Sequence, residues 1–202
     1  MARRAHIVLI ILLLAGFINP VYSALPKKKK KGAFKQGQSD WQLGMGFFSF
    51  MKPKTDSLLY YGIVETKAVP PIQIRYEYAL TDNIGMGGMI AMAFAHVKVT
   101  DNTDPENING IDYSYFMCGA RFLYHYPLQS EFIDPYVAST IGITLTGSSP
   151  YGPSNPFETY KKTFLWGIHA GANVYFLEDF MGAFLEVGYG MSVMNAGLTF
   201  KF

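Results

Sequence analysis

Hydrophobic and polar residues alternate with a period of two through the last nine positions of the chain. The even positions hold Met194, Ala196, Leu198, Phe200 and Phe202, and the odd positions hold Asn195, Gly197, Thr199 and Lys201. Successive side chains of a β-strand point to opposite faces, so this pattern predicts a strand with one apolar and one polar face. Because the alternation continues to the final residue, we expect the carboxyl terminus to form part of a sheet.

The same alternation recurs upstream and predicts seven more strands. Turn-forming residues such as Thr81-Asp82-Asn83 and longer polar stretches separate them. In the second strand, Pro70 and Pro71 are expected to mark the beginning, where a missing N–H is tolerated. The predicted strands run over residues 41–51, 70–80, 84–99, 113–126, 135–146, 162–176, 183–189 and 194–202. The chain is therefore predicted to be all-β, an eight-stranded antiparallel up-and-down barrel.

The predicted connections alternate in length. Those after the first, third and fifth strands are long, covering residues 52–69, 101–110 and 147–160, and those after the second, fourth and sixth are shorter. The connection after the seventh strand is short and departs from this alternation. Outer-membrane barrels have short turns on the periplasmic side and long loops outside. An even number of strands also returns both termini to one end.

The character of the polar face distinguishes a membrane barrel from a soluble one. A soluble barrel of the lipocalin type would need many Lys, Glu and Asp residues on its outer face. Here the polar face carries mostly small residues and few charges, and charged residues are 16% of the chain against about 25% in typical soluble domains. Small side chains suit the narrow interior of an eight-stranded barrel. We therefore predict a transmembrane barrel with its apolar face toward lipid.

The few charges project to the predicted interior. An ion buried away from water is costly unless it is paired and hydrogen-bonded, so these side chains are expected to form an internal network that plugs the barrel. The predicted lumen network consists of Arg75, Glu77, Arg121, His125, His169, Glu186 and Lys201.

Aromatic residues gather near strand ends on the predicted lipid face, as the interfacial girdles of membrane barrels require. They are Trp41, Tyr76, Tyr78, Phe122, Tyr124, Tyr126, Trp166, Phe176, Phe200 and Phe202. The last strand, with Leu198, Phe200 and a terminal Phe202, resembles the C-terminal signal read by the outer-membrane assembly machinery.

The amino-terminal region is typical of an exported chain. Arg3 and Arg4 precede an apolar run of 11 residues, 7–17, which is too short to span a bilayer. We predict a signal peptide over 1–23, a flexible basic periplasmic lead-in over 24–39 that contains Lys27–Lys31, and the barrel over 40–202. An uncleaved anchor is the alternative, because a basic run directly after the cleavage site usually hinders export.

Several motifs resemble small outer-membrane β-barrel proteins of the Bacteroidetes, within the OmpA/OmpX-like group of eight-stranded barrels. The motifs are residues 75–78, 80–83, 119–121, 171–176 and 182–190, and the resemblance extends over about residues 40–202. It implies the outer membrane of a Gram-negative (diderm) bacterium and says little about activity. Such barrels act as envelope stabilisers, adhesins, small pores and subunits of larger complexes.

The sequence favours a non-enzymatic role. The candidate catalytic residues His96, His125 and His169 fall on different strands at different depths, so no nucleophile, base and acid are expected within hydrogen-bonding reach. No spacing of His, Cys or carboxylates predicts a metal, no cofactor motif is present, and Cys118 has no second cysteine to pair with.

Charge also argues against nucleic acid. Residues 1–23 contain two of the 17 basic residues, so the remainder holds 15 basic and 15 acidic residues. We expect a plugged scaffold whose binding role lies in its loops, with outer-membrane lipid, the assembly machinery and an envelope protein as partners. The alternatives are a narrow pore for ions or small solutes and a subunit of a larger complex that uses residues 58–61.

Overall fold

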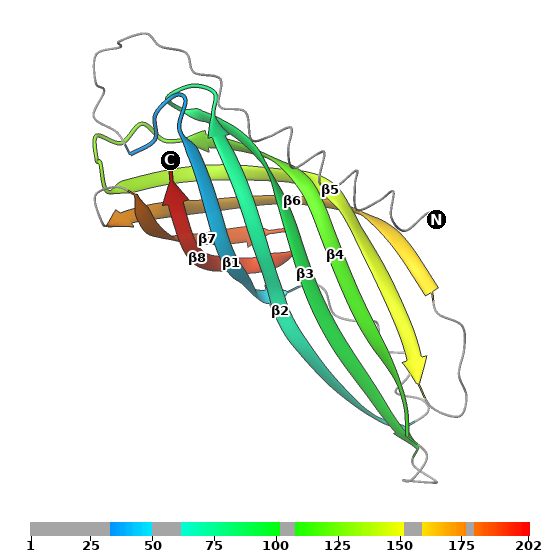
Figure 1. The fold of residues 1–202 in the computed structure, drawn as a ribbon. Coiled ribbons are helices and arrows are strands. Elements are labelled where there is room, and N and C mark those ends of the chain that lie inside the picture. The colour runs from blue at the N-terminus through cyan, green and yellow to red at the C-terminus, as the bar shows by residue number, and fades with distance from the viewer. Residues whose placement is uncertain (1–32, 50–61, 102–107, 152–158, 177–179) are drawn as a thin grey trace.

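The structure, a computed structural model, describes residues 33–49, 62–101, 108–151, 159–176 and 180–202. Eight strands pair in chain order, each antiparallel to the next, and β8 returns to pair with β1 (Figure 1). The strands are β1 (Ser39–Ser49), β2 (Gly62–Ala79), β3 (Ile84–Asp101), β4 (Ile108–His125), β5 (Ile133–Tyr151), β6 (Thr159–Phe176), β7 (Met181–Tyr189) and β8 (Ser192–Lys201). The predicted all-β, eight-stranded antiparallel barrel is confirmed.

The first and last strands close the barrel. Their register runs from Asp40 opposite Lys201 to Ser49 opposite Ser192. The terminal residue belongs to this seam, because Phe202 N donates to Ser39 O at 2.8 Å and Ser39 N donates to Phe202 O at 3.0 Å. The carboxyl terminus is therefore held by the sheet, as the alternation predicted. We call this end of the barrel the terminus end and the opposite end the loop end.

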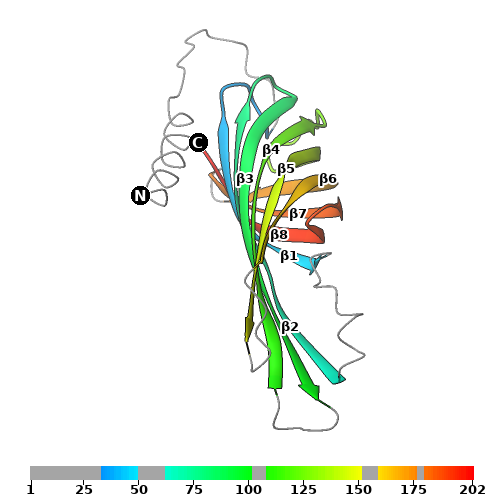
Figure 2. The same cartoon turned by 90° about the vertical axis from the view of Figure 1, so that its right-hand side faces the viewer.

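The strands differ in length, and the barrel wall is correspondingly uneven. β1, β7 and β8 have 11, 9 and 10 residues, whereas β2 to β6 have 18 or 19. Figures 1 and 2 show β2, β3 and β4 continuing well past the end of β1. We call this part the sheet extension and define it as residues 62–69, 94–101, 108–116, 145–151 and 159–164.

The sheet extension corrects the predicted strand boundaries. Residues 62–69, 108–110, 147–151 and 159–160 were predicted as loops and are strand. The prediction that Pro70 and Pro71 begin this strand was wrong. They lie inside β2, where the register with β3 shifts between Val69 and Ile72. A bulge leaves residues unpaired, so two prolines without N–H groups fit there without breaking a ladder.

Burial follows the predicted alternation through the closed part of the barrel. In β1, the even positions from Asp40 to Gly46 are buried and the odd positions from Trp41 to Met45 are exposed. The alternation fails at Phe48, whose even position would place it on the inward face but which is 76% exposed, with a φ of 53°. A positive φ is unfavourable for a bulky residue and turns the strand at its loop end.

The segment before β1 differs from the flexible lead-in that the sequence predicted. Ala33 and Phe34 are buried, Gln36 N donates to the Asp82 carboxylate at 3.1 Å, and Gly37 N donates to Ala79 O at 2.9 Å. Residues 33–38 therefore pack against the terminus end of the barrel, because two apolar side chains find cover there. Residues 1–32, with the predicted signal peptide and lysine run, lie outside the described residues. In the described ranges, no helix is both long and apolar enough to cross a bilayer.

Candidate functional site

The centre of the lumen is an ion cluster around Glu186 of β7. Its Oε2 lies 2.8 Å from Arg75 Nη1, and its Oε1 lies 2.6 Å from Arg121 Nη2. Tyr136 Oη donates to Oε1 at 2.9 Å. All of these side chains are buried, so one carboxylate holds together strands β2, β4, β5 and β7 across the interior.

Neutral polar groups fix the orientation of Arg75. Its Nε donates to Gln73 Oε1 at 3.0 Å, and its Nη1 donates to Gln42 Oε1 at 3.3 Å. The guanidinium lies 4.9 Å from the ring centre of Phe184, a cation–π distance. Gln73 in turn donates to Asn195 at 2.9 Å, so the cluster continues from β2 to β8. This hydrogen-bonded network fills most of the centre of the lumen.

A second cluster fills the terminus end of the lumen. The ring of His125 lies between two carboxylates, with Nε2 2.7 Å from Glu77 and Nδ1 2.8 Å from Asp134. Asn173 Nδ2 donates to Asp134 at 3.1 Å. The Phe34 ring stacks on the His125 ring at a centroid distance of 3.5 Å and an angle of 4°. The segment before β1 thus covers the histidine at the mouth of the barrel.

Lys201 belongs to this mouth and not to the Glu186 cluster. Its Nζ donates to Ala33 O at 2.7 Å and lies 3.4 Å from the ring centre of Tyr175. Tyr175 Oη donates to the Asp40 carboxylate at 2.7 Å. The penultimate residue of the chain therefore holds the segment before β1 in place.

His169 of β6 lies in the lumen apart from both clusters. It is 5% exposed, and its Nε2 lies 3.1 Å from the carbonyl oxygen of Ser192. Its Nδ1 has no hydrogen-bond partner among the described residues.

The seven residues predicted as one lumen network therefore occupy separate places. Arg75, Arg121 and Glu186 meet in the central cluster, Glu77 and His125 meet at the mouth, and Lys201 and His169 have other partners. Sequence reasoning missed several members whose side chains share the same face: Asp40, Gln42, Gln73, Asp134, Tyr136, Asn173, Tyr175 and Asn195. Strand parity alone could have identified most of them, whereas nothing in the sequence placed Phe34 on His125.

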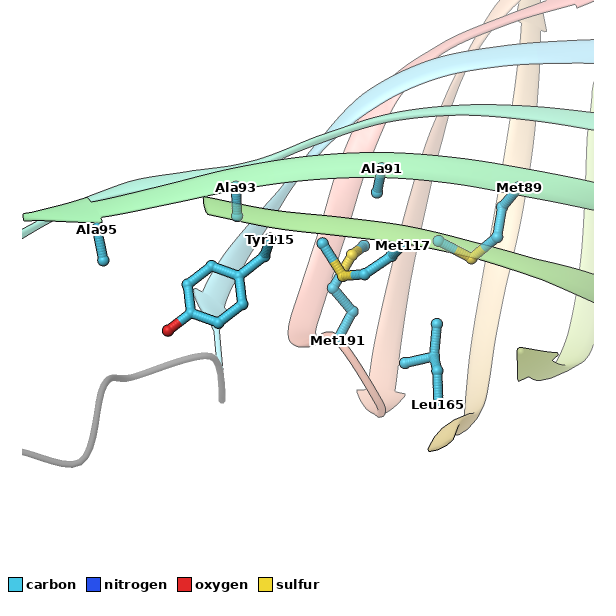
Figure 3. Packing of buried hydrophobic residues seen from close by; sticks show 8 residues of the cluster. All are labelled: Met89, Ala91, Ala93, Ala95, Tyr115, Met117, Leu165 and Met191. Carbon is cyan, nitrogen blue, oxygen red and sulfur yellow. The ribbon is translucent and has the colours of Figure 1, made fainter. Parts of the chain in front are cut away.

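Buried apolar side chains lie on the inward face of the barrel toward its loop end (Figure 3). The buried cluster contains three methionines, together with small residues of β3 and single residues of β4 and β6. Its members are Met89, Ala91, Ala93, Ala95, Tyr115, Met117, Leu165 and Met191. These side chains make the inward face apolar at this height, in contrast to the polar lining around Glu186.

The third candidate histidine lies on the outward face of the sheet extension. His96 Nδ1 contacts Asp112 Oδ1, and Tyr151 Oη lies 3.1 Å from His96 Nε2. Burial raises the pKa of the Tyr151 hydroxyl, and the nearby Asp112 charge acts in the same direction. The side chains of His96 and Asp112 are 47% and 60% exposed. Within the described ranges, no group of three or more His, Cys, Asp or Glu residues is arranged to hold a metal ion.

The outward face of the closed barrel is apolar all round. Large hydrophobic side chains there are about half exposed, including Leu43 (50%), Ile74 (43%), Ile141 (49%) and Leu185 (51%). Aromatic pairs lie toward both ends, with Trp41 near Tyr76 at one end and Trp166 near Tyr189 at the other.

The residues of the predicted assembly signal lie on the outward face of β8 and just beyond it. Leu198 is 42% exposed and Phe202 67% exposed. Phe180, in the turn before β7, packs edge-on against the rings of Phe200 and Phe202.

No protein-family model matches the sequence, and no curated protein matches it either. Among solved structures, the chain is similar to the N-terminal β-barrel domain of Pseudomonas aeruginosa OprF, with 12% sequence identity and a TM-score of 0.45 over 83% of this chain and 98% of that chain. It is also similar to Yersinia pestis Ail, the attachment invasion locus protein, in complex with the heparin analogue sucrose octasulfate (11% identity, TM-score 0.44, 82% and 98% covered). A second structure of Ail has 12% identity and a TM-score of 0.40, with 83% and 99% covered.

Proposed function

We propose that the chain is an integral outer-membrane β-barrel protein of a Gram-negative bacterium, with its terminus end toward the periplasm and its loop end outside the cell. The observation that carries this proposal is the continuous apolar surface around the closed barrel, where large hydrophobic side chains are about half exposed. Soluble monomers rarely expose apolar patches larger than a few hundred Å². Lipid is the environment in which such a belt, flanked by aromatic pairs, is stable.

The transmembrane part acts in this proposal as a plugged scaffold without enzymatic activity. The Glu186 cluster fills its centre, Phe34 covers the periplasmic mouth, and the methionine-containing cluster makes the inward face apolar toward the other end. Among the described residues, what remains accessible from outside is the sheet extension. A binding or envelope role therefore belongs to that part of the chain.

Membrane fractionation combined with heat-dependent gel mobility tests location and closure together. We expect the protein in the outer-membrane fraction, with a folded band that shifts in mobility only after heating. A mature protein that stays monodisperse in buffer without detergent would reverse the assignment of inside and outside. A soluble carrier of small ligands would then be the better description.

A narrow pore is the second candidate. The polar side chains that line the lumen, such as Asp40 and Gln73, favour it. Planar-bilayer conductance discriminates the two candidates. The scaffold predicts no stable channels, and the pore predicts channels that change when Arg75 or Glu186 is neutralised. Phe34→Ala is a useful third variant in the conductance measurement, because it removes only the side chain that covers the periplasmic mouth.

Four further expectations remain part of the proposal. Residues 1–23 act as a signal peptide, and the final strand with Leu198, Phe200 and Phe202 is recognised by the outer-membrane assembly machinery. The relationship to Bacteroidetes barrels rests on the sequence motifs. Residues 58–61, suggested as a contact with an envelope partner, lie outside the described residues. Co-purification of a stoichiometric partner in detergent tests that role.

A further inference from the structure

The sheet extension is an open sheet with two free edges. β1 pairs with β2 only as far as Met45 opposite Ile72, and β7 pairs with β6 only as far as Tyr189 opposite Ile168. Beyond these points, β2 pairs only with β3 and β6 only with β5 among the described residues. An edge strand has a row of backbone N–H and C=O groups without partners in the sheet, so each edge can take up another strand.

Exposure distinguishes these edges from the interior of the sheet extension. Residues 65–70 of β2 and 160–164 of β6 are exposed at every position, whereas burial alternates along residues 94–97 of β3. At the β6 edge, Tyr160 is 79% exposed and Phe164 is 66% exposed. Both faces of this edge are therefore accessible to a partner.

Charge differs between the two edges. Lys161 and Lys162 are consecutive, so they lie on opposite faces of β6. Residues 159–167 contain no carboxylate, and within the described ranges neither lysine forms an ion pair. On the β2 edge, Glu65 and Lys67 lie two positions apart on the same face and offset each other. Of the two edges, only that of β6 is therefore basic.

We propose that the β6 edge binds an extended, acidic segment of another protein, which joins the sheet as a further antiparallel strand. This inference rests on the proposed position of the sheet extension outside the cell. Residues 159–167 contain no proline, so no backbone donor is missing from the edge. Backbone hydrogen bonds supply the affinity, and side chains on alternate faces supply the specificity. An acidic residue opposite each of Lys161 and Lys162 lies within reach of the ammonium group, because opposite residues of paired strands are neighbours.

The edge also sets the order of residues in the partner. Tyr160 and Phe164 lie on the same face as Lys162, two positions to either side of it, so the partner residues opposite these two rings are apolar. Thr163 favours a threonine opposite it. In an antiparallel partner, the five residues that run from opposite Phe164 to opposite Tyr160 are therefore apolar, threonine, acidic, acidic and apolar.

The probe is a fluorescent peptide, blocked at both ends, with the core Val-Thr-Glu-Glu-Val. The detergent-solubilised protein should bind it saturably in a fluorescence anisotropy titration at low ionic strength. The same peptide with lysine in place of both glutamates should bind much more weakly, and equal binding of the two peptides overturns the proposal. The titration does not depend on where the protein is located in the cell. Its failure would therefore leave the result of membrane fractionation standing.

Backbone methylation of the peptide distinguishes strand addition from simple attraction between charges. Only every second N–H group of an added antiparallel strand faces its neighbour. N-methylation at alternate residues should therefore abolish binding in one phase, and the peptide methylated in the other phase should still bind. Equal binding of the two methylated peptides, or binding of neither, overturns the proposal.

Exposed variants locate the binding site. Lys161→Gln combined with Lys162→Gln should weaken binding of the acidic peptide about three- to tenfold, because two exposed ion pairs are lost. Lys67→Gln combined with Lys98→Gln is the matched control, since it removes two positive charges from the sheet extension away from the β6 edge. Unchanged binding in the first double variant, or an equal loss in the second, overturns the proposal.

Cross-linking locates the peptide on the wild-type protein. A photoreactive diazirine in the apolar residue predicted to lie opposite Tyr160 should become attached to residues 159–162, as read by mass spectrometry of the digested protein. Attachment to residues 62–69 of the β2 edge would contradict the proposal.

Discussion

The closed barrel and the sheet extension distribute charged residues differently over their two faces. In the barrel, the inward face carries Arg75, Arg121 and Glu186, and the outward face is apolar. In the sheet extension, Ala95 and Val97 are buried on the inward face, whereas His96 and Asp112 are exposed on the outward face. Because β3 and β4 pass through both regions without interruption, one strand carries both patterns.

If the two regions lie in different surroundings, as proposed, the surroundings and not the strand itself decide which face carries charge. Side chains in contact with lipid must be apolar, so polar groups of the barrel have to be satisfied inside. A sheet in water has the opposite requirement, with its apolar side chains covered and its charges outside. The height at which the outward face changes from Phe94 to His96 therefore marks the proposed outer boundary of the bilayer.

The largest expected effect comes from removing the carboxylate that the two buried guanidiniums share. Glu186→Gln should lower the free energy of unfolding by about 3–5 kcal/mol, because it leaves buried charges without a partner. Denaturant titration of the protein folded in lipid vesicles measures it. Asp112→Asn, which breaks an exposed pair in the sheet extension, is the matched control, and equal losses would contradict the difference between the regions.

A cation placed on the outward face should also separate the two regions. Leu185→Arg puts a charge at the middle of the surface proposed to face lipid and should cost about 2–4 kcal/mol of folding free energy in vesicles. Ser149→Arg puts the same charge on the outward face of the sheet extension and should change stability by less than about 0.5 kcal/mol. If Leu185→Arg were tolerated as well as Ser149→Arg, the barrel surface would not face lipid.

A polar residue on the inward face gives a smaller effect. Val97 is fully buried in the sheet extension, and Val97→Asn should cost about 1–3 kcal/mol because an amide without partners is desolvated there. Lys98→Asn, the next residue on the opposite face, should have little effect. Hydrogen exchange of the backbone amides of residues 94–98 measures the loss of local stability in each variant. The two variants would exchange equally fast if the inward face of the sheet extension were in contact with water.

The smallest expected effect concerns the His96–Asp112 pair. Exposed ion pairs contribute below about 1 kcal/mol and are screened by salt, so Asp112→Asn should destabilise slightly at low ionic strength and less at high ionic strength. Denaturation curves at two salt concentrations test this. A loss that salt does not change would point to a structural role of Asp112 beyond its charge.

The sequence predicted the barrel well because a closed barrel with an apolar outer face and a polar inner face imposes a strict period of two. Strand count, pairing order and the inward position of Arg75 or Glu186 all follow from the alternation of odd and even positions. This alternation gives the face on which a side chain lies but not its position along the barrel axis or its partner. The separation of His125 from the Glu186 cluster could therefore not be predicted. The sheet extension was missed in part because Pro70 and Pro71 resemble a strand start, and a bulge that shifts the pairing leaves no simple sequence signal.

The contact between Lys201 and the carbonyl oxygen of Ala33 has a consequence for the order of assembly. The cover over His125 depends on a side chain of β8, so the mouth of the barrel is sealed only when β8 has paired with β1 and the seam has closed. We expect Lys201→Ala to leave Phe34 unanchored. Closure of the seam and closure of this entrance would then be a single event.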